Sequence, residues 1–466
     1  SIFLFGTSVT LGLATGCGDN NGNSGLDCSK VTGTCMEVPA GADAMLQTAV
    51  NSLADNTTII LGSGTFQMTN QLTIRNKGIH LVGQGIDGDG ATVLDFGSTT
   101  TQGNGVDVVG DGFLVQDLVV LDAAKDGIRV EDSDGVTFHH IRATWTNTSA
   151  STNGAYGIYP VHSKNVLVEN SEAHNASDAG LYVGQCQHVI VHDNLVSGNV
   201  AGLEIENTEY ADVFNNEATD NVGGIVVFDL PGNPIVGRDI RLRDNMIHDN
   251  NHTNFASGGT VASIPSGTGT FAMASRRVEI TGNTYAKNGT GDIAIISGLT
   301  LDMDPAHWTL PTSTLVGDYT DLGLIVPAAG TIANFRSENI LVAGNTHSGS
   351  GTDPDLGDPL HVGLLLAAVY GPSTPVDNVL YDSVQEPKFS ATVAADNSNA
   401  NHICVGGNTG GTFASLDLAE QSPAGFKPFF RPAKPFAPFD CVALDGGAVA
   451  QVTLPSTQPA ALTTGN

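Results

Sequence analysis

The chain has 466 residues and carries 48 acidic against 18 basic side chains, which gives a formal net charge of −30. This charge argues against nucleic acid or an anionic membrane surface as a partner. Only 14% of the residues are charged and 6% are aromatic, while glycine occurs 57 times, so the composition favours strands and turns over long amphipathic helices.

The N-terminal residues 1–17 are apolar but too short to span a bilayer, a combination typical of an export segment. They end in Leu13-Ala-Thr-Gly-Cys17, which resembles a bacterial lipobox, where the cysteine becomes lipidated. We therefore expect a lipoprotein-type signal segment, with Cys17 anchoring the protein to outer-membrane lipid at the bacterial cell envelope.

Cysteine spacing supports export to an oxidising compartment. Residues 18–37 read as a flexible tether in which Cys28 and Cys35 lie seven residues apart, while Cys404 and Cys441 bracket the C-terminal region. These spacings predict two disulfides, Cys28–Cys35 and Cys404–Cys441. Cys186 is left over, and we interpret it as a structural thiol.

Next in the chain, apolar residues at helical spacing predict an amphipathic helix within residues 38–55, which we expect to cap the open end of a solenoid.

A repeat of about 22 residues then dominates the chain. Each unit starts with a glycine that is followed by alternating apolar residues, and the intervals between these glycines are 22, 30, 23, 22 and 22 residues. The repeat glycines are Gly105, Gly127, Gly157, Gly180, Gly202 and Gly224. Three apolar-in strands can be drawn in each unit, which predicts a single-stranded right-handed parallel β-helix with three sides over residues 38–415.

Asparagines recur at one corner of this repeat, where copies on neighbouring rungs can hydrogen-bond to one another. The predicted ladder contains Asn194, Asn216, Asn245, Asn283, Asn345 and Asn408.

Insertions interrupt the repeat at 144–154, 231–237, 252–275 and 299–333, and insertions in solenoids collect on one face, often the binding face. From 416 to 466 the repeat gives way to a Pro/Phe-rich stretch, which we interpret as an extended strap followed by a tail that is loose after about 452.

Side chains that alternate with the inward row of the first strand face outward and stack rung upon rung, about 4.8 Å apart. Together with the corner that follows, these rows predict a groove rich in aromatic, basic and acidic groups. Its candidate substrate-binding residues are Asp107, Tyr159, Gln185, Glu206 and Asp229, and its candidate catalytic residues are Arg129, His162, Tyr182 and Glu204. Such a lining suits a sugar chain.

Two chemistries fit these residues. Tyr182 or Tyr159 with His162 can shuttle the C5 proton of a uronate while Arg129 neutralises its carboxylate, which gives β-elimination or epimerisation. Alternatively, Glu204 and Glu206 form a hydrolytic pair about 6.8 Å apart along the strand, near the spacing of inverting glycosidases.

Each site residue also has a plainer interpretation. An outward carboxylate such as Glu206 is usually a solubilising surface group, and Tyr159 and Tyr182 on adjacent rungs can simply stabilise strand pairing. The net charge disfavours uronates. No cofactor is required and no metal site is predicted, although calcium is possible at Asp87-Gly-Asp89-Gly with Asp95.

The segments 156–163, 177–185 and 201–207 resemble bacterial right-handed parallel β-helix repeat proteins of the pectate-lyase-like superfamily, and more closely an exported, largely uncharacterised lipoprotein family within it. The resemblance extends over residues 38–445 and implies polysaccharide lyases, hydrolases, C5-epimerases or binding modules. Tyr159-Pro-Val-His162 only echoes the Asp-Pro-His-Asp motif of mannuronan epimerases, since tyrosine replaces the aspartate.

From these features we expect a monomeric, exported and envelope-anchored β-helix that binds or modifies a polysaccharide in the groove on its first sheet. The alternative is a non-catalytic structural or interaction protein of the cell envelope.

Overall fold

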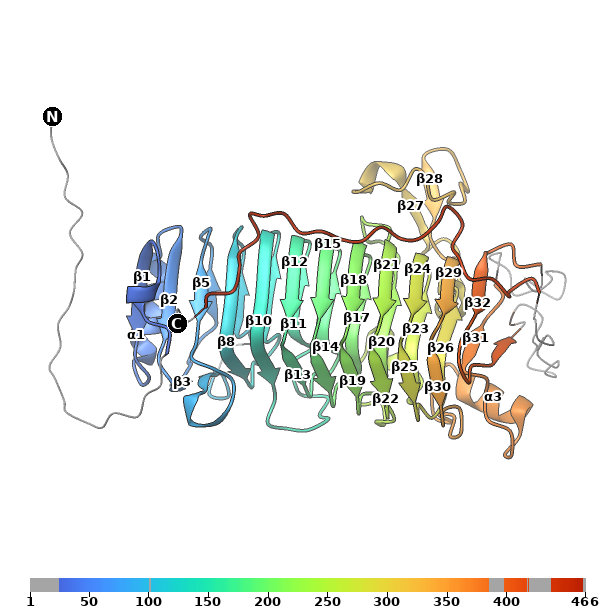
Figure 1. Cartoon of the computed structure of the whole chain (residues 1–466), viewed down its shortest axis with the longest axis horizontal. Helices are drawn as coiled ribbons and strands as arrows, with labels where there is room; N and C mark the ends of the chain where they lie inside the picture. Colours follow the sequence, from blue (N-terminus) through green and yellow to red (C-terminus); the bar gives the residue numbers. More distant parts are fainter. Residues whose placement is uncertain (1–24, 100–101, 385–397, 417, 419–436, 464–466) are drawn as a thin grey trace, which may run out of the picture.

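The computed structural model describes residues 25–99, 102–384, 398–416, 418 and 437–463, which form an elongated solenoid of stacked parallel strands (Figure 1). Cys17, the export segment and most of the Pro/Phe-rich stretch lie outside the described residues.

Each coil of the solenoid contributes three short strands, as the repeat predicts. One coil consists of β14 (Ala179–Gly184), β15 (Gln187–His192) and β16 (Leu195–Ser197), and the next of β17 (Ala201–Glu206), β18 (Glu209–Phe214) and β19 (Glu217–Thr219). Each strand pairs in parallel with its counterpart one coil later, so equivalent side chains lie in rows along the solenoid.

The first strand of every coil belongs to one sheet, here called the first sheet. Its described strands are β4 (Leu72–Ile74), β7 (Val106–Val108), β9 (Ile128–Glu131), β11 (Tyr156–Val161), β14, β17, β20 (Gly223–Phe228), β23 (Thr268–Met273), β26 (Gly291–Ile296), β31 (Val379–Tyr381) and β33 (Phe413–Ser415).

The other two sides of the solenoid form one continuous second sheet, because β8 and β10 run through the corner between them. Besides β15, β16, β18 and β19, its described strands are β1 (Thr34–Val38), β2 (Thr57–Leu61), β3 (Gly64–Gln67), β5 (His80–Val82), β6 (Thr92–Asp95), β8 (Phe113–Leu121), β10 (Asp134–Thr144), β12 (Lys164–Glu169), β13 (Glu172–His174), β21 (Arg238–Arg243), β22 (Met246–His248), β24 (Arg276–Thr281), β25 (Thr284–Ala286), β29 (Glu338–Ala343), β30 (Thr346–Ser348) and β32 (Ile403–Gly406).

The inward rows fill the solenoid with aliphatic side chains, and one continuous apolar core extends from Val38 to Phe439. Cys186 is fully buried in this core and burial raises the pKa of its thiol to about 12, so it is an inert packing group, as predicted.

The predicted asparagine ladder is present at one corner. Asn194 donates from Nδ2 to the Oδ1 of Asn216 at 2.9 Å, and the pattern repeats through Asn245, Asn283 and Asn345 to Asn408 at 2.9–3.0 Å. A second ladder, which the sequence reading missed, links Asn199, Asn221, Asn250 and Asn288.

Both predicted disulfides form, Cys28–Cys35 near the N-terminal end and Cys404–Cys441 near the C-terminal end. The helix expected within 38–55 is shorter: α1 spans Asp43–Ala49 and continues as the 3-10 helix Val50–Ser52, while Val38 ends β1. Leu46 of α1 is buried against the first coils.

The two remaining described helices are α2 (Gly298–Leu301) and α3 (Val362–Tyr370). Within the described ranges, no helix is long and apolar enough to cross a membrane. The expectation of a monomer stays a prediction.

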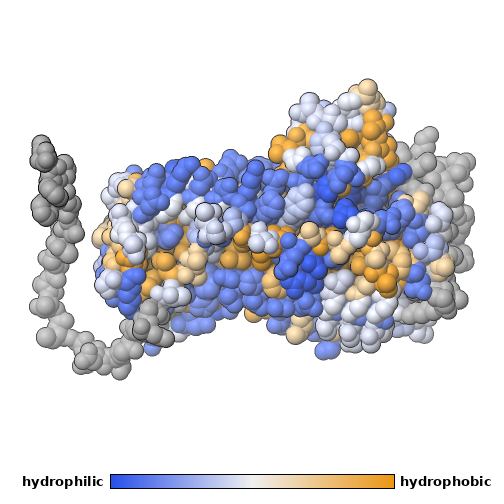
Figure 2. Space-filling view, turned by 45° about the horizontal axis from the view of Figure 1, so that its top comes forward, coloured by the Kyte–Doolittle hydropathy of each residue, from blue (hydrophilic) through white to orange (hydrophobic). Residues whose placement is uncertain are grey.

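The longest insertion carries a small antiparallel pair, β27 (Thr309–Pro311) and β28 (Thr331–Ala333), which projects from the solenoid. Figure 2 shows apolar surface on this projection, where Met303, Val316 and Val326 are exposed.

Residues 453–463 are not loose in the structure, which corrects the sequence-based expectation for this part of the tail. Residues 437–463 run back along the outside of the solenoid towards its N-terminal end (Figure 1). Gln458 Nε2 donates to the carbonyl of Val136 at 2.6 Å, and the amide of Leu462 donates to Gln116 Oε1 at 2.6 Å. Buried polar groups on the second sheet thus take their partners from this segment.

Candidate functional site

The outward row of the first sheet is aligned as the repeat predicts. Asp107 lies opposite Arg129, Arg129 opposite Tyr159, and Tyr182 opposite Glu204. The structure therefore brings several of the predicted site residues together on β7, β9, β11, β14 and β17.

Over its central part this row is covered, which corrects the expectation of an open groove. Tyr182, Glu204 and Glu206 are only 4%, 2% and 6% exposed. Insertions lie beside this part of the row: Val261 and Ile264 from one insertion belong to the same apolar cluster as Tyr182, and Asn233 from another donates to Glu206. Glu206 is thus not the solubilising surface group of the plainer interpretation.

Three tyrosine rings meet at this site. The ring centroids of Tyr156 and Tyr159 are 4.6 Å apart, those of Tyr156 and Tyr182 are 4.5 Å apart, and those of Tyr159 and Tyr182 are 4.8 Å apart. Tyr156 and Tyr159 are only partly buried, so this side of the cluster faces solvent.

Glu204 and Glu206 project from the same face of β17 into different surroundings. Glu206 accepts hydrogen bonds from the Tyr182 hydroxyl at 2.7 Å and from Asn233 Nδ2 at 2.6 Å. Burial raises the pKa of Glu206, and these two donors oppose the rise. Burial also raises the pKa of Glu204 well above its ordinary value, and its buried Oε2 has no hydrogen-bond partner among the described residues.

Two further carboxyls, which the sequence analysis did not predict, border the tyrosine cluster. Asp126 is fully buried and burial raises its pKa to about 6, while burial and the charge of Glu206 raise the pKa of Asp178 to about 7. The Tyr156 hydroxyl is 3.4 Å from Asp178 Oδ2.

A signal for Tyr156 and Asp126 was available in the row just before the repeat glycines. Later rungs of that row carry Ala179, Ala201 and Gly223, so a tyrosine and an aspartate stand out there. Asn233 is in the insertion 231–237, which no repeat pattern covers.

Arg129 is paired with acidic side chains, whereas the uronate chemistry requires it to be available to neutralise the carboxylate of the substrate. Its guanidinium pairs with Glu131 and lies 3.7 Å from Asp107 Oδ1. Asp107 is also held by Arg75 at 2.5 Å and by Asn104 at 2.8 Å. Arg129 and Asp107 therefore form an ion-pair network at the edge of the site.

His162 and Gln185 lie at the corner after the first strand, where both have positive φ angles of 51° and 53°. His162 Nε2 hydrogen-bonds to Gln185 Oε1 at 2.8 Å, and the imidazole side chain is 41% exposed. The imidazole is thus partnered outside the tyrosine cluster, although its charge influences the pKa of Glu206.

Asp229 is buried in a neighbouring polar cluster. Its Oδ2 accepts from the Gly237 amide at 2.8 Å and from Asn334 Nδ2 at 2.7 Å. Burial raises its pKa to about 6. These bonds tie the insertions to the first sheet, and the substrate-binding role of Asp229 stays a prediction.

The residues considered for calcium do not gather. Asp87 accepts from Arg142 at 2.9 Å, whereas Asp95 accepts from Gln67 and from the amide of Gly97. Among the described residues, no group of three or more His, Cys, Asp or Glu side chains is arranged to hold a metal ion.

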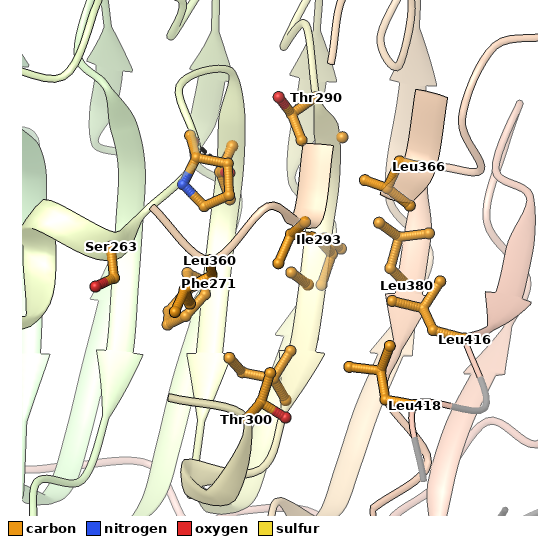
Figure 3. Close-up of a pocket in the computed structure, with 16 residues that line it drawn as sticks. Ser263, Phe271, Thr290, Ile293, Thr300, Leu360, Leu366, Leu380, Leu416 and Leu418 are labelled. Atoms are coloured by element: carbon orange, nitrogen blue, oxygen red, sulfur yellow. Dashed lines mark hydrogen bonds between the residues drawn. The ribbon is translucent and has the colours of Figure 1, made fainter. Parts of the chain in front are cut away.

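An apolar pocket lies beyond the tyrosine cluster, between α3 and the outer face of the first sheet (Figure 3). Its lining includes Phe271, Ile293, Leu366, Leu380, Leu416 and Leu418. Its polar side chains are the hydroxyls of Ser and Thr, without a carboxyl, imidazole or thiol among the described lining residues, so acid–base chemistry points to the tyrosine cluster instead.

The family described as "Right handed beta helix region" matches residues 77–240 and 126–304, which include the tyrosine cluster. This part of the chain is a right-handed parallel β-helix. The resemblance to right-handed β-helix repeat proteins is thereby confirmed at the level of the fold.

Solved structures of the same architecture are similar to the chain at low identity. The A-module of mannuronan C-5 epimerase AlgE4 from Azotobacter vinelandii is 17% identical with a TM-score of 0.44, over 73% of this chain and 90% of that one. Endopolygalacturonase I from Stereum purpureum is 14% identical with a TM-score of 0.41, over 68% and 96%.

The surface protein and adhesin PfbA of Streptococcus pneumoniae is 9% identical with a TM-score of 0.42, over 73% of this chain and 83% of that one. With TM-scores below 0.5, these similarities give no basis for transferring an activity. No curated protein sequence matches the chain significantly.

Proposed function

We propose that this β-helix binds a polysaccharide at the tyrosine cluster and hydrolyses it with Glu204 and Glu206. The observation that carries the proposal is the contrast between two carboxyls on one strand: Glu206 accepts two hydrogen bonds, while Glu204 is buried with one oxygen unpartnered.

The different surroundings of Glu204 and Glu206 suit them to different roles in hydrolysis. Burial raises the pKa of Glu204 well above its ordinary value and so favours its protonated form, as a general acid that protonates the leaving oxygen requires. The hydrogen bonds to Glu206 favour its ionised form relative to Glu204, as a base that activates water requires.

Geometry along the strand supports the inverting form of the reaction. Residues i and i+2 of one strand are about 6.8 Å apart along the backbone. Carboxyls that project in parallel from them keep a similar separation, within the roughly 6.5–9.5 Å that leaves room for a water molecule between the two groups. Tyr156 and Tyr159 border the pair with partly exposed rings, which can stack on the face of a sugar.

The structure favours this chemistry over the uronate chemistry. Burial raises the pKa of Tyr182, so its phenol is a poor base, and its hydroxyl already donates to Glu206. Arg129, which would neutralise a uronate, is already paired with Glu131.

The test measures release of reducing ends from neutral, acidic and amino polysaccharides by the wild type, Glu204→Gln and Glu217→Gln. We expect Glu204→Gln to lose at least about 100-fold in kcat, because the general acid is absent. Glu217 is a half-exposed carboxylate on the second sheet, so Glu217→Gln should keep wild-type activity. Equal rates for wild type and Glu204→Gln would contradict the proposal.

A non-catalytic interaction role is the second candidate, and the exposed apolar side chains of the β27–β28 projection favour it. It predicts that the wild type releases no reducing ends from any polysaccharide and that Glu204→Gln leaves the protein's biological effect intact.

We also propose that the protein acts at the bacterial envelope. The two disulfides fit an oxidising compartment. Labelling of cells with a fatty-acid analogue tests the anchor: a wild-type chain that incorporates label and a Cys17→Ser chain that does not would support it, and label in both would contradict it.

A further inference from the structure

We infer that the sugar bound at the tyrosine cluster carries an ammonium group, so that the substrate class is a polysaccharide containing free amino sugars. The inference rests on the proposed function and deepens it by naming the substrate.

The first observation is a set of buried acceptors with few donors. Oδ1 of Asp178 and Oε2 of Glu204 are buried and have no hydrogen-bond partner among the described residues, and the buried carboxyl of Asp126 has only the backbone amide of Tyr156 and, at 3.8 Å, Lys125 Nζ beside it. Asp126 and Glu204 are themselves 0% and 2% exposed. Buried acceptors left unpaired are costly, and an ammonium group supplies three donors and no acceptor. A ligand of this kind satisfies them better than an acetamide or a carboxylate.

The second observation is the packing of the three tyrosine rings beside these carboxyls. Their centroids lie within 4.8 Å of one another, and Tyr156 reaches to 3.4 Å from Asp178. A cation over an aromatic face is stabilised by the ring quadrupole, and more strongly when water is excluded. The three rings and the carboxyls can therefore both interact with the ammonium group of an amino sugar, whereas a neutral sugar interacts favourably with the rings only.

The charges around the cluster oppose an anionic ligand. Arg129 is paired with Glu131 and Asp107, and His162 is bonded to Gln185. Lys125 is 3.8 Å from Asp126, beyond hydrogen-bond distance, and its side chain is 59% exposed.

Further acidic groups act on the site from the neighbouring elements: Glu131 on β9, Asp107 on β7, Glu206 on β17 and Asp229 after β20. Arg129 and Lys125 each lie beside carboxylates, and acidic groups outnumber them around the cluster, so the local field matches the net charge of −30 in favouring a cationic ligand.

The cluster also predicts a proton signature. Burial raises the pKa values of Asp126 to about 6 and of Asp178 to about 7, so part of this cluster is protonated in the free protein near pH 6. An ammonium that binds there displaces those protons, whereas a neutral sugar does not.

The experiment is isothermal titration calorimetry of the full chain with a glucosamine hexamer, its N-acetylated counterpart and a galacturonate hexamer. Titrations run at pH 4.5 and 5.5, where the sugar amines are protonated, in two buffers of different ionisation enthalpy, which reports protons released on binding. We expect the glucosamine hexamer to bind at least 10-fold more tightly than the N-acetylated one, to release protons and to bind more tightly at pH 5.5.

Variants assign the effect to the cluster. Asp126→Asn and Asp178→Asn should each remove at least 10-fold of the preference for the amino sugar, while Asp220→Asn, at an exposed corner between β19 and β20, should keep it. If the variants do not fold, the ligand preference and proton release of the wild type still decide the question.

The outcomes separate the two proposals. Hydrolysis of a neutral or acidic polysaccharide, together with equal or weaker binding of the amino sugar, overturns the inference and leaves the hydrolytic function standing. Binding of the amino sugar without cleavage supports the inference and overturns the hydrolytic function. Failure of all three ligands to bind, or an amino-sugar preference that survives both variants, overturns the inference.

Discussion

The Tyr182 hydroxyl donates a 2.7 Å hydrogen bond to Glu206 Oε2 across adjacent coils of the β-helix. This bond opposes the rise that burial causes in the pKa of Glu206, while Glu204, two residues earlier on the same strand, has an oxygen without such a donor. The repeat places β14 beside β17, with Tyr182 opposite Glu204 and Gly184 opposite Glu206, so this hydrogen bond runs diagonally between two rows.

Removal of the hydrogen bond from Tyr182 tests whether it lowers the pKa of Glu206. We expect Tyr182→Phe to lower kcat/KM about 10- to 100-fold, because the ionised form of Glu206 loses one of its two side-chain donors. The acidic limb of the kcat/KM profile against pH should move to higher pH. Tyr210→Phe, on the second sheet, is the matched control and should leave both quantities unchanged. A lower rate without movement of the acidic limb would contradict this role of Tyr182.

The buried carboxyl of Asp126 should weaken the fold as pH rises. Burial raises its pKa to about 6 from 3.8, so between these values the folded state holds a proton that the unfolded state has released. The free energy of unfolding should therefore fall between about pH 4 and pH 6, by about 3 kcal/mol for this group. Asp126→Asn should remove that part of the slope in urea unfolding measured across this range, and an unchanged slope would show that Asp126 titrates normally.

Glu169 should act in the opposite direction. Hydrogen bonds with His139 and His192 lower its pKa to about 2 from 4.5. Its contribution to stability is therefore complete above pH 4.5 and is lost as pH falls towards 2, by about 1–2 kcal/mol for this partly exposed group. Glu169→Gln should be less stable than the wild type at pH 6 and should show a smaller loss between pH 4.5 and 2.5. Parallel stability curves for the two proteins would rule this out.

The asparagines at the centre of the ladder should contribute most to the free energy of unfolding. Asn216 bonds to Asn194, Asn245 and the carbonyl of Val191, and it is 1% exposed. Asn216→Ala leaves several buried groups unpaired and should lower the free energy of unfolding by about 3 kcal/mol. Asn408→Ala, at the last rung, should cost less because Asn408 is partly exposed. Equal losses at the two positions in chemical unfolding would contradict the ladder account.

The segment 437–463 should stabilise the solenoid from outside. Deletion of residues 448–466 removes at least one hydrogen-bond partner from each of Glu279, Thr137 and Gln116, which are buried on the second sheet. We expect thermal unfolding to shift down by several degrees, while deletion of 464–466 alone has no effect. An unchanged melting temperature after the longer deletion would mean that this segment contributes little.

Most of the solenoid follows from its repeat, since a strict period determines which residues face inward and which positions stack. The ladder from Asn194 to Asn408 and the alignment of Tyr182 with Glu204 were both predicted on this basis. The second ladder has the same period but was missed, because Asn199 lies in the corner after the third strand of its coil, beyond the last apolar row of the repeat.

The site was predicted less completely, because insertions have no period. Val261 and Ile264 of one insertion share an apolar cluster with Tyr182, and Asn233 of another insertion reaches Glu206. Likewise, the pairing of Arg129 with Glu131 depends on side-chain rotamers that spacing does not specify. The path of residues 453–463 follows from contacts with strands more than 300 positions away in sequence.

The most direct test of the central claim is a proton NMR time course of the anomeric region during digestion of the preferred polysaccharide. Hydrolysis by Glu204 and Glu206 predicts a new anomeric signal whose first-formed configuration is opposite to that of the cleaved bond, and Glu204→Gln should abolish it. A spectrum that stays unchanged across amino, neutral and acidic polysaccharides, or a first product of retained configuration, would contradict the account.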